Sequence, residues 1–302
     1  MSSQALILRL PNEIQFEILE TAITLLPSSV FRLALICSHV CKLIDWILYR
    51  RVVLKSARAL KLFAKNESLR DGRKVGEYVG SLAITAIPAF EGRDEAIISV
   101  LHACPNLRSL FLNSALIPSS PSTALVGRNP NINVLSLTDR PISTPLGLHL
   151  TLTNLTPITS PALMALLPNT THLHFAEPPH DTALTQWVDP LRILSSVPVP
   201  LHHLSHLSLP RREHANEEND IIFAQCISSL LSAPSALKVL VISIYPAKWE
   251  DEHDETAGIW KLTKEIERRD ERVVIRKAYF DGVMEEWSKN PYRVWDGLVL
   301  KS

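Results

Sequence analysis

Short apolar segments recur through the chain from about residue 75 onward, separated by proline, asparagine, serine and threonine. Each segment follows or approaches the pattern L-x-x-L-x-L, which is typical of leucine-rich repeats. The periodic positions are Val79, Leu82 and Ile84; Leu107, Leu110 and Leu112; Ile132, Leu135 and Leu137; Thr170, Leu173 and Phe175; Leu204, Leu207 and Leu209; and Leu237, Leu240 and Ile242. We interpret these segments as strands that lie side by side in one sheet.

Helical segments stand between several of these strands. EAIISVLHAC, ALMALL and IIFAQCISSLL each precede a strand and have the composition of return helices. Alternating strands and helices imply right-handed crossovers and a parallel sheet. The repeat spacing is irregular, so we expect larger loops, bigger helices or an extra strand such as LHLTL at 148–152. The predicted fold class is therefore α/β, with an irregular leucine-rich-repeat-like solenoid and a parallel sheet.

The first 54 residues have a different, helical pattern. LPNEIQFEILETAITLL places Ile14, Ile18 and Leu25 at near-helical spacing after Pro11, a residue favoured at helix starts. FRLALICSHVCKLIDWILYRRVVL is apolar on more than one side, so it must be buried or meet a partner. We predict a module of two or three short helices at 1–54, a repeat domain at 55–302, and a cap over its open edge at about 265–302, beginning with the strand-like ERVVIRKAYF.

Alternation along the predicted strands assigns a second, outer face to the sheet. Side chains switch face with period two, so leucines point inward and the residues between them point outward. We predict that this face binds a protein substrate, and a face without a ligand or one covered by a loop remains the alternative. The candidate substrate surface is Ser109, Phe111, Val134, Ser136, His172, His174, His206, Ser208, Val239 and Val241.

Charge and composition disfavour several function classes. Lys plus Arg and Asp plus Glu are both 31, so no net positive charge attracts nucleic acid or a lipid surface. No uncharged apolar run approaches the roughly 18 to 20 residues that span a bilayer. Four scattered cysteines form no disulfide framework, and no secretory signal precedes the first helix. We expect a soluble protein of the cytoplasm, the nucleus or both.

Catalytic and metal-binding patterns are absent from the sequence. The chain has only 9 glycines against 21 prolines, and it contains no G-x-S-x-G, P-loop, H-E-x-x-H or G-x-G-x-x-G motif. His172, His174 and His206 share a strand face only if their strands are in register, and no cysteine or carboxylate accompanies them. We predict no metal, no cofactor and no enzymatic activity. The charged stretch KWEDEHDE at 248–255 is predicted as a solvated loop.

A family resemblance lies in the N-terminal segment. Residues 8–54 resemble the F-box, a three-helix module that docks on the Skp1 subunit of cullin-based ubiquitin ligases. The ILYRRVVL ending, the degenerate repeats and the tryptophan-containing tail are similar to the large fungal, basidiomycete-type group of F-box proteins. The matching positions are Leu10, Pro11, Glu13, Ile14, Ile18 and Leu19 at its start, and Leu35, Ile36, Cys37 and Leu43 in its second apolar helix.

The resemblance implies an adaptor that holds a substrate near a ubiquitin-charged enzyme. The expected Skp1-docking residues are Leu10, Pro11, Ile14, Ile18, Leu19 and Leu35. These side chains could instead pack on the repeat domain. The usual basic and aromatic residues of the family are replaced by Ser38, His39, Val40 and Cys41, which motivates a rival hypothesis of a scaffold with a vestigial F-box. An enzyme of unknown class is the third hypothesis.

Overall fold

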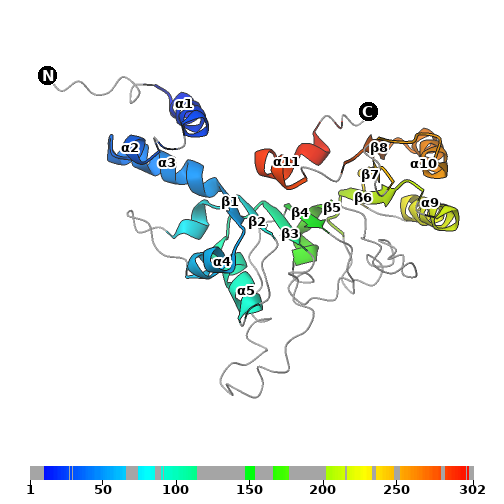
Figure 1. Cartoon of the computed structure of the whole chain (residues 1–302), viewed down its shortest axis with the longest axis horizontal. Helices are drawn as coiled ribbons and strands as arrows, with labels where there is room; N and C mark the ends of the chain where they lie inside the picture. The colour runs from blue at the N-terminus through cyan, green and yellow to red at the C-terminus, as the bar shows by residue number, and fades with distance from the viewer. Residues whose placement is uncertain are drawn as a thin grey trace, which may run out of the picture.

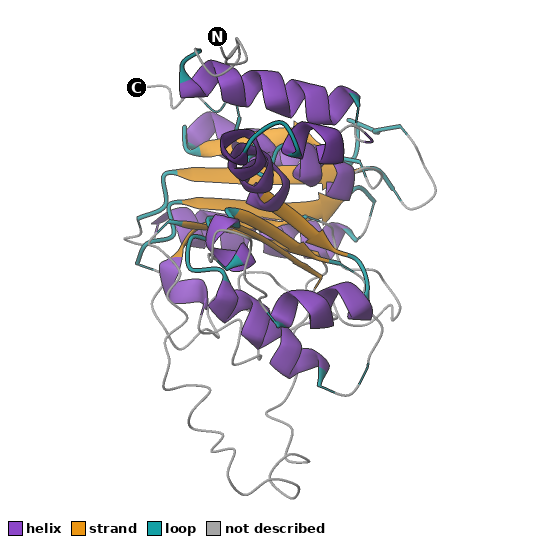
Figure 2. Cartoon of the chain, turned by 90° about the vertical axis from the view of Figure 1, so that its left-hand side faces the viewer, coloured by secondary structure: helices purple, strands orange, loops and turns teal. Residues whose placement is uncertain are grey.

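A computed structural model gives the arrangement of most of the chain. Its elements form an α/β fold in which one sheet lies between helices (Figures 1 and 2). The structure describes residues 10–26, 28, 30–65, 74–85, 90, 92–113, 147–153, 166–176, 202–214, 216–232, 236–247, 252–279, 283–296 and 298.

The sheet has eight parallel strands, ordered in space as they are along the chain. They are β1 Arg51–Leu54, β2 Ser81–Ile84, β3 Ser109–Asn113, β4 Leu148–Thr153, β5 Thr170–Phe175, β6 His206–Arg212, β7 Val239–Tyr245 and β8 Val273–Lys277. The parallel sheet, the extra strand at 148–152 and the strand in ERVVIRKAYF are thereby confirmed. The predicted repeat at 132–137 lies outside the described residues, and β3 pairs directly with β4.

Leucines hold the sheet together on its inner face. Leu110, Leu150 and Leu173 occupy one row across neighbouring strands and are fully buried or nearly so. The row continues through Leu207 and Leu240 in the same register. The predicted inward direction of these leucines is confirmed, and each fully buried leucine contributes about 1.5 to 3 kcal/mol of hydrophobic stabilisation.

Helices cover the leucine face of the sheet. Apolar residues of four helices belong to the same buried cluster as the leucine row, among them Leu60, Val100, Phe223 and Ile259. Figure 1 shows α4 and α5 on this side of the sheet. The α-helices are α1 Asn12–Leu25, α2 Val30–Ala34, α3 Ser38–Arg50, α4 Ala57–Ala64, α5 Arg93–Ala103, α9 Glu217–Ser232, α10 Gly258–Arg269 and α11 Val283–Lys289, and short 3₁₀ helices are η3 Val75–Tyr78, η5 Leu167–Asn169 and η6 Arg293–Trp295.

The N-terminal helices join the sheet without a linker. Helix α3 ends at Arg50 and β1 begins at Arg51, pairing with β2 from Ser81 onward. The predicted helical module of 1–54 therefore ends too late, because residues 51–54 are the first strand of the sheet. Their β-branched pair Val52 and Val53 suits a strand better than a helix end.

The residues predicted as a cap take two positions: β8 pairs with β7, the strand of the last predicted repeat, and the residues after β8 lie elsewhere. Strand β8 is itself the edge strand, and α11 and η6 return across the outer face of the sheet. Trp287 of α11 packs there against Ala83 of β2 and Phe111 of β3. Among the described residues, no helix combines the length and the apolar character needed to cross a membrane.

A buried carboxylate fixes the connection between β7 and α10. The side chain of Glu213 is fully buried, and its Oε1 accepts hydrogen bonds from Trp260 Nε1 at 2.6 Å and from His253 Nδ1 at 2.8 Å. Its Oε2 accepts one from the backbone N–H of Asp254 at 3.0 Å. The predicted solvated loop of 248–255 is therefore wrong at His253, whose side chain is only 2 % exposed.

Candidate functional site

The three N-terminal helices have a small apolar core of their own. It consists of Leu19, Val30, Val40 and Ile44. Leu19, predicted as a docking residue, is only 2 % exposed and packs inside this core. Its predicted place on the docking surface is therefore wrong for this structure, because residue 19 faces the helices that it joins.

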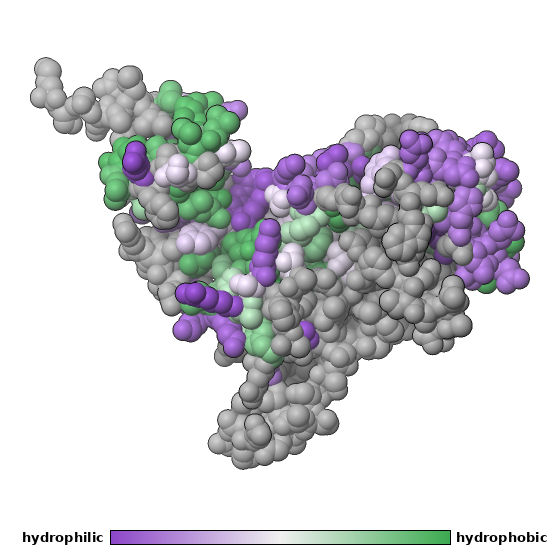
Figure 3. All heavy atoms as spheres, viewed as in Figure 1, coloured by the Kyte–Doolittle hydropathy of each residue, from purple (hydrophilic) through white to green (hydrophobic). Residues whose placement is uncertain are grey.

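Other predicted docking residues remain on the surface of this module. Leu10, Ile14 and Ile18 are 38 %, 42 % and 42 % exposed; Ile14 and Ile18 are one turn apart on one side of α1, and Leu10 lies just before the helix. Pro11 beside them is exposed, and Leu35 at the end of α2 is 77 % exposed. Hydrophobic side chains gather over α1 and α2 in Figure 3. We call Leu10, Pro11, Ile14, Ile18 and Leu35 the helical docking face.

His39 and Val40, two of the positions at which the sequence departs from the F-box pattern that it resembles, make contacts inside the module. His39 Nε2 is hydrogen-bonded to Gln15 Oε1 at 3.0 Å, and Gln15 Nε2 donates to the carbonyl of Leu10 at 2.7 Å. Val40 is buried, and its backbone N–H donates to Cys37 Sγ at the start of α3. These residues tie α3 to α1, so their side chains position the helical docking face from behind.

The predicted substrate surface is largely covered. Side chains on this face are Ser109, Phe111, His174, Ser208, Val239 and Val241, which are at most 9 % exposed. His172 and His206 are half-buried. Val134 and Ser136 lie outside the described residues. The prediction of an open binding face is therefore wrong for the described part of the sheet, and the alternative of a covered face describes the structure.

Residues 283–296 cover Phe111 and the histidines of this face, and we call them the C-terminal segment. Trp287 meets Phe111 edge to face with ring centroids 5.5 Å apart. At one end of the sheet, Arg51 Nη1 donates to the carbonyl of Lys289 at 2.7 Å. At the other end, Arg276 Nη1 donates to the carbonyl of Val294 at 2.6 Å. The segment is thus fastened at both edges of the sheet.

Histidines from three adjacent strands stack beneath this segment. The rings of His149 and His172 are 3.7 Å apart and nearly parallel, and those of His172 and His206 are 4.0 Å apart. Trp295 meets His172 and His206 edge to face, and Tyr292 does the same to His149. The register that the sequence left open therefore aligns His172 with His206.

The surroundings of this histidine stack favour the neutral form of its rings. Burial lowers the pKa of His149 to about 4 and that of His172 to about 3, with a further contribution from the neighbouring histidines. The hydroxyls of Thr171 and Ser205 are hydrogen-bonded to Nδ1 of His172 and His206. Stacked rings direct their nitrogens sideways, and no three metal-ligating side chains converge in the described part of the chain.

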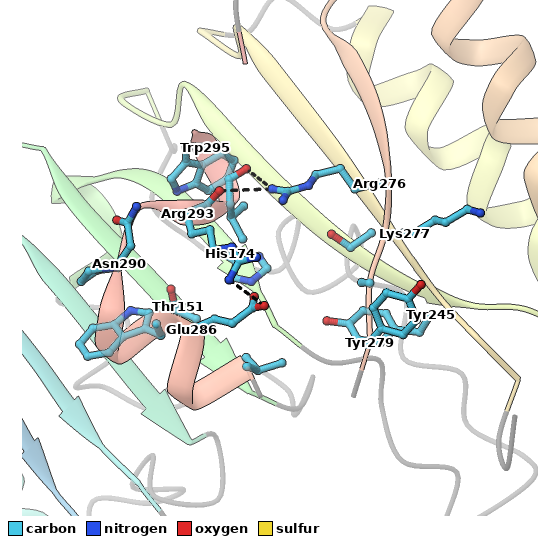
Figure 4. Close-up of a pocket in the computed structure, with 16 residues that line it drawn as sticks. Thr151, His174, Tyr245, Arg276, Lys277, Tyr279, Glu286, Asn290, Arg293 and Trp295 are labelled. Atoms are coloured by element: carbon cyan, nitrogen blue, oxygen red, sulfur yellow. Dashed lines mark hydrogen bonds and ion pairs between the residues drawn. The ribbon is translucent and has the colours of Figure 1, made fainter. Parts of the chain in front are cut away.

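A pocket of about 280 Å³ lies where the C-terminal segment, the sheet and β8 meet (Figure 4). His174 and Thr151 form part of its floor from the sheet, and Arg276 lines it from β8. The remaining lining residues are Ser243, Tyr245, Lys277, Ala278, Tyr279, Val283, Glu286, Trp287, Asn290, Pro291, Arg293, Val294 and Trp295. Glu286 is paired with Arg293 at 2.9 Å inside this lining.

Sequence reasoning named only one residue of this pocket, His174. Two others had a signal: extending the alternation into LHLTL places Thr151 on the outer face, and extending it across β7 and β8 aligns Arg276 with Ser243. The tryptophans of the C-terminal segment indicated a cap but not its place, because a helix beyond the last strand can return over either face of a sheet.

We expect the buried His174 to make the folded state sensitive to acid. Burial, and secondly the charge of Arg276, lowers its pKa from 6.5 to about 3. Between these values the unfolded chain binds more protons, so stability falls as the pH drops below about 6.5. From pH 7 to pH 5, His174 alone should cost about 2 kcal/mol. Urea unfolding at pH 7 and at pH 5 measures this loss of stability. The loss should be about 2 kcal/mol smaller for His174→Gln than for the wild type, and equal losses would contradict the prediction.

The helical docking face and the pocket under the C-terminal segment are thus the two candidate sites among the described residues. One is apolar and exposed, as a protein-binding surface requires, and the other is concave and combines aromatic walls with polar groups, as is typical of a small-molecule site. No family model matches this chain, and neither a curated protein nor a solved structure does.

Proposed function

We propose that the protein is a substrate-recognition adaptor of a Skp1-cullin-F-box ubiquitin ligase, with an N-terminal F-box and an irregular leucine-rich-repeat-like solenoid. The observation that carries this proposal is the helical docking face. Ile14 and Ile18 are exposed along one side of α1 and Leu10 is exposed just before it, although the module has a separate apolar core. Exposed apolar positions at helical spacing support docking into a groove of a partner protein.

Such an adaptor carries out no chemistry itself. It raises the effective concentration of substrate lysines near a ubiquitin thioester that another subunit holds, in the cytoplasm or the nucleus. Direct attachment of α3 to β1 favours this role, because a stiff junction fixes the distance between the docking face and the sheet. The outer face of the sheet would receive a protein substrate only after the C-terminal segment leaves it.

Co-purification with Skp1 tests the docking face. We expect the double variant Leu10→Asp with Ile14→Asp to bind Skp1 at least about tenfold more weakly, because two charges would be buried against an apolar groove. Ile221→Asp with Ile222→Asp is the matched control, since these residues of α9 are 49 % and 43 % exposed and lie outside the module. An equal loss in both double variants, or no loss in the first, would refute the assignment.

The rival function is a protein-interaction scaffold that no longer binds Skp1. Its support is the hydrogen bond of His39 with Gln15. His39 is one of the residues that differ from the F-box pattern, and here its side chain serves packing inside the module. Titration of purified Skp1 onto the full chain separates the two functions. A complex at micromolar concentration supports the adaptor, and no complex at that concentration supports the scaffold.

A further inference from the structure

We propose that the pocket under the C-terminal segment binds a small organic anion, one with a carboxylate or phosphate group on a planar body. This site is separate from the helical docking face and does not depend on Skp1 binding. The anion would bridge the sheet, β8 and the C-terminal segment, because all three line the pocket. Its binding would therefore hold the segment in place over the outer face.

The first support is an imidazole with unused hydrogen-bonding capacity. His174 is 9 % exposed, lines the pocket, and makes no hydrogen bond to the described part of the chain, with Nδ1 fully buried. A buried polar group without a partner costs about 1 to 3 kcal/mol. The low pKa of about 3 keeps the ring neutral, so it offers one N–H donor and one acceptor.

The second support is a positive charge that no carboxylate neutralises. Arg276 donates to the backbone carbonyls of Arg293 and Val294 and has no acidic partner within the described residues. Its charge reaches into the site, because it contributes to lowering the pKa of His174. The other cations of the lining differ in this respect: Arg293 pairs with Glu286, and Lys277 pairs with Glu255. The pocket therefore retains the charge of Arg276 for an anion.

The walls and the size of the pocket suggest the body of the ligand. Tyr245 and Tyr279 stand on one side of the hollow, opposite Trp295 and His174 (Figure 4). Tyr245 is held in place by its hydroxyl, which donates to the carbonyl of Ala176. A volume of about 280 Å³ exceeds what a simple inorganic anion fills. An aromatic ring bearing the charged group would occupy the remaining space against these rings.

Calorimetric titration of the full chain with phenyl phosphate and benzyl alcohol tests the charge requirement. We expect phenyl phosphate to bind at least about tenfold more tightly, because only the phosphate can pair with Arg276 and accept from His174. NMR titration should show the pKa of His174 rising when phenyl phosphate is bound. Equal affinities of the two probes, or no binding of phenyl phosphate up to millimolar concentration, would overturn the proposal.

Two variants locate the site. Arg276→Met should weaken phenyl phosphate binding at least about tenfold, whereas Lys261→Met removes the same charge from an exposed position of α10 and should leave it unchanged. Because Arg276 also holds the C-terminal segment, His174→Gln is the second variant, and it should weaken phenyl phosphate binding without removing a cation. Equal losses in Arg276→Met and Lys261→Met would overturn the proposed location.

Discussion

Trp287→Ala should release the C-terminal segment from the sheet while the rest of the protein stays folded. Trp287 is a residue of α11, is 5 % exposed, and packs against Ala83 and Phe111 of the sheet. Truncation of a buried tryptophan costs about 3 to 5 kcal/mol. The segment follows the last strand and could detach without breaking the sheet, so this cost should appear as local opening. Hydrogen exchange should show the protection of residues 283–296 falling about 100- to 4,000-fold.

Trp46→Ala is the control for this experiment. Trp46 lies on α3, is 37 % exposed, and contacts Phe16 of α1. Its removal should leave the protection of 283–296 unchanged. If Trp287→Ala instead lowers the protection of β3 and β4 as much as that of the segment, the segment is part of the cooperative core, and the outer face cannot be uncovered separately.

An uncovered outer face matters for the proposed function. Several residues predicted to bind substrate lie under the C-terminal segment, among them Phe111 and His206. Under the adaptor proposal, substrate binding and docking of the segment compete for one surface. An anion in the pocket under the segment would then favour the closed state, because it binds only where the segment is in place.

Much of the sheet could be predicted from the sequence. The repeated leucines fix which face is buried, since a slip of one residue would turn Leu110 and its neighbours into solvent. The same alternation assigned Phe111, His174 and Val241 to the outer face, where the structure has them. Local periodicity determines these features, so they need no knowledge of the rest of the chain.

The cover over that face could not be predicted in the same way. Trp287 and Trp295 read equally well as a cap over the last strand, because hydrophobicity shows that a residue is buried but not against what. The prediction for Leu19 was wrong for a similar reason. Leu19 directly follows Ile18 in the same apolar pattern of α1, although Leu19 is in the core and Ile18 is on the surface. Only the position of α3 decides which of them faces inward.

Glu213→Ala should destabilise the protein by about 3 to 5 kcal/mol. Its buried carboxylate accepts hydrogen bonds from Trp260, His253 and the backbone of Asp254, so its removal leaves three donors without a partner. These donors lie on the loop before α10 and on α10 itself, so the last helix over the leucine face should loosen first. Glu213→Gln keeps an acceptor oxygen and should lose less than Glu213→Ala.

Glu255→Ala is the matched control for Glu213→Ala, because it removes a carboxylate from the loop before α10 that Glu213 binds. Glu255 is half exposed and forms ion pairs with Lys264 and Lys277 at 3.2 and 2.6 Å. Exposed pairs contribute little, since water replaces each partner. Urea unfolding should therefore place the Glu255→Ala midpoint near that of the wild type and the Glu213→Ala midpoint far below it. Similar midpoints for the two variants would mean that the buried carboxylate does not hold α10 in place.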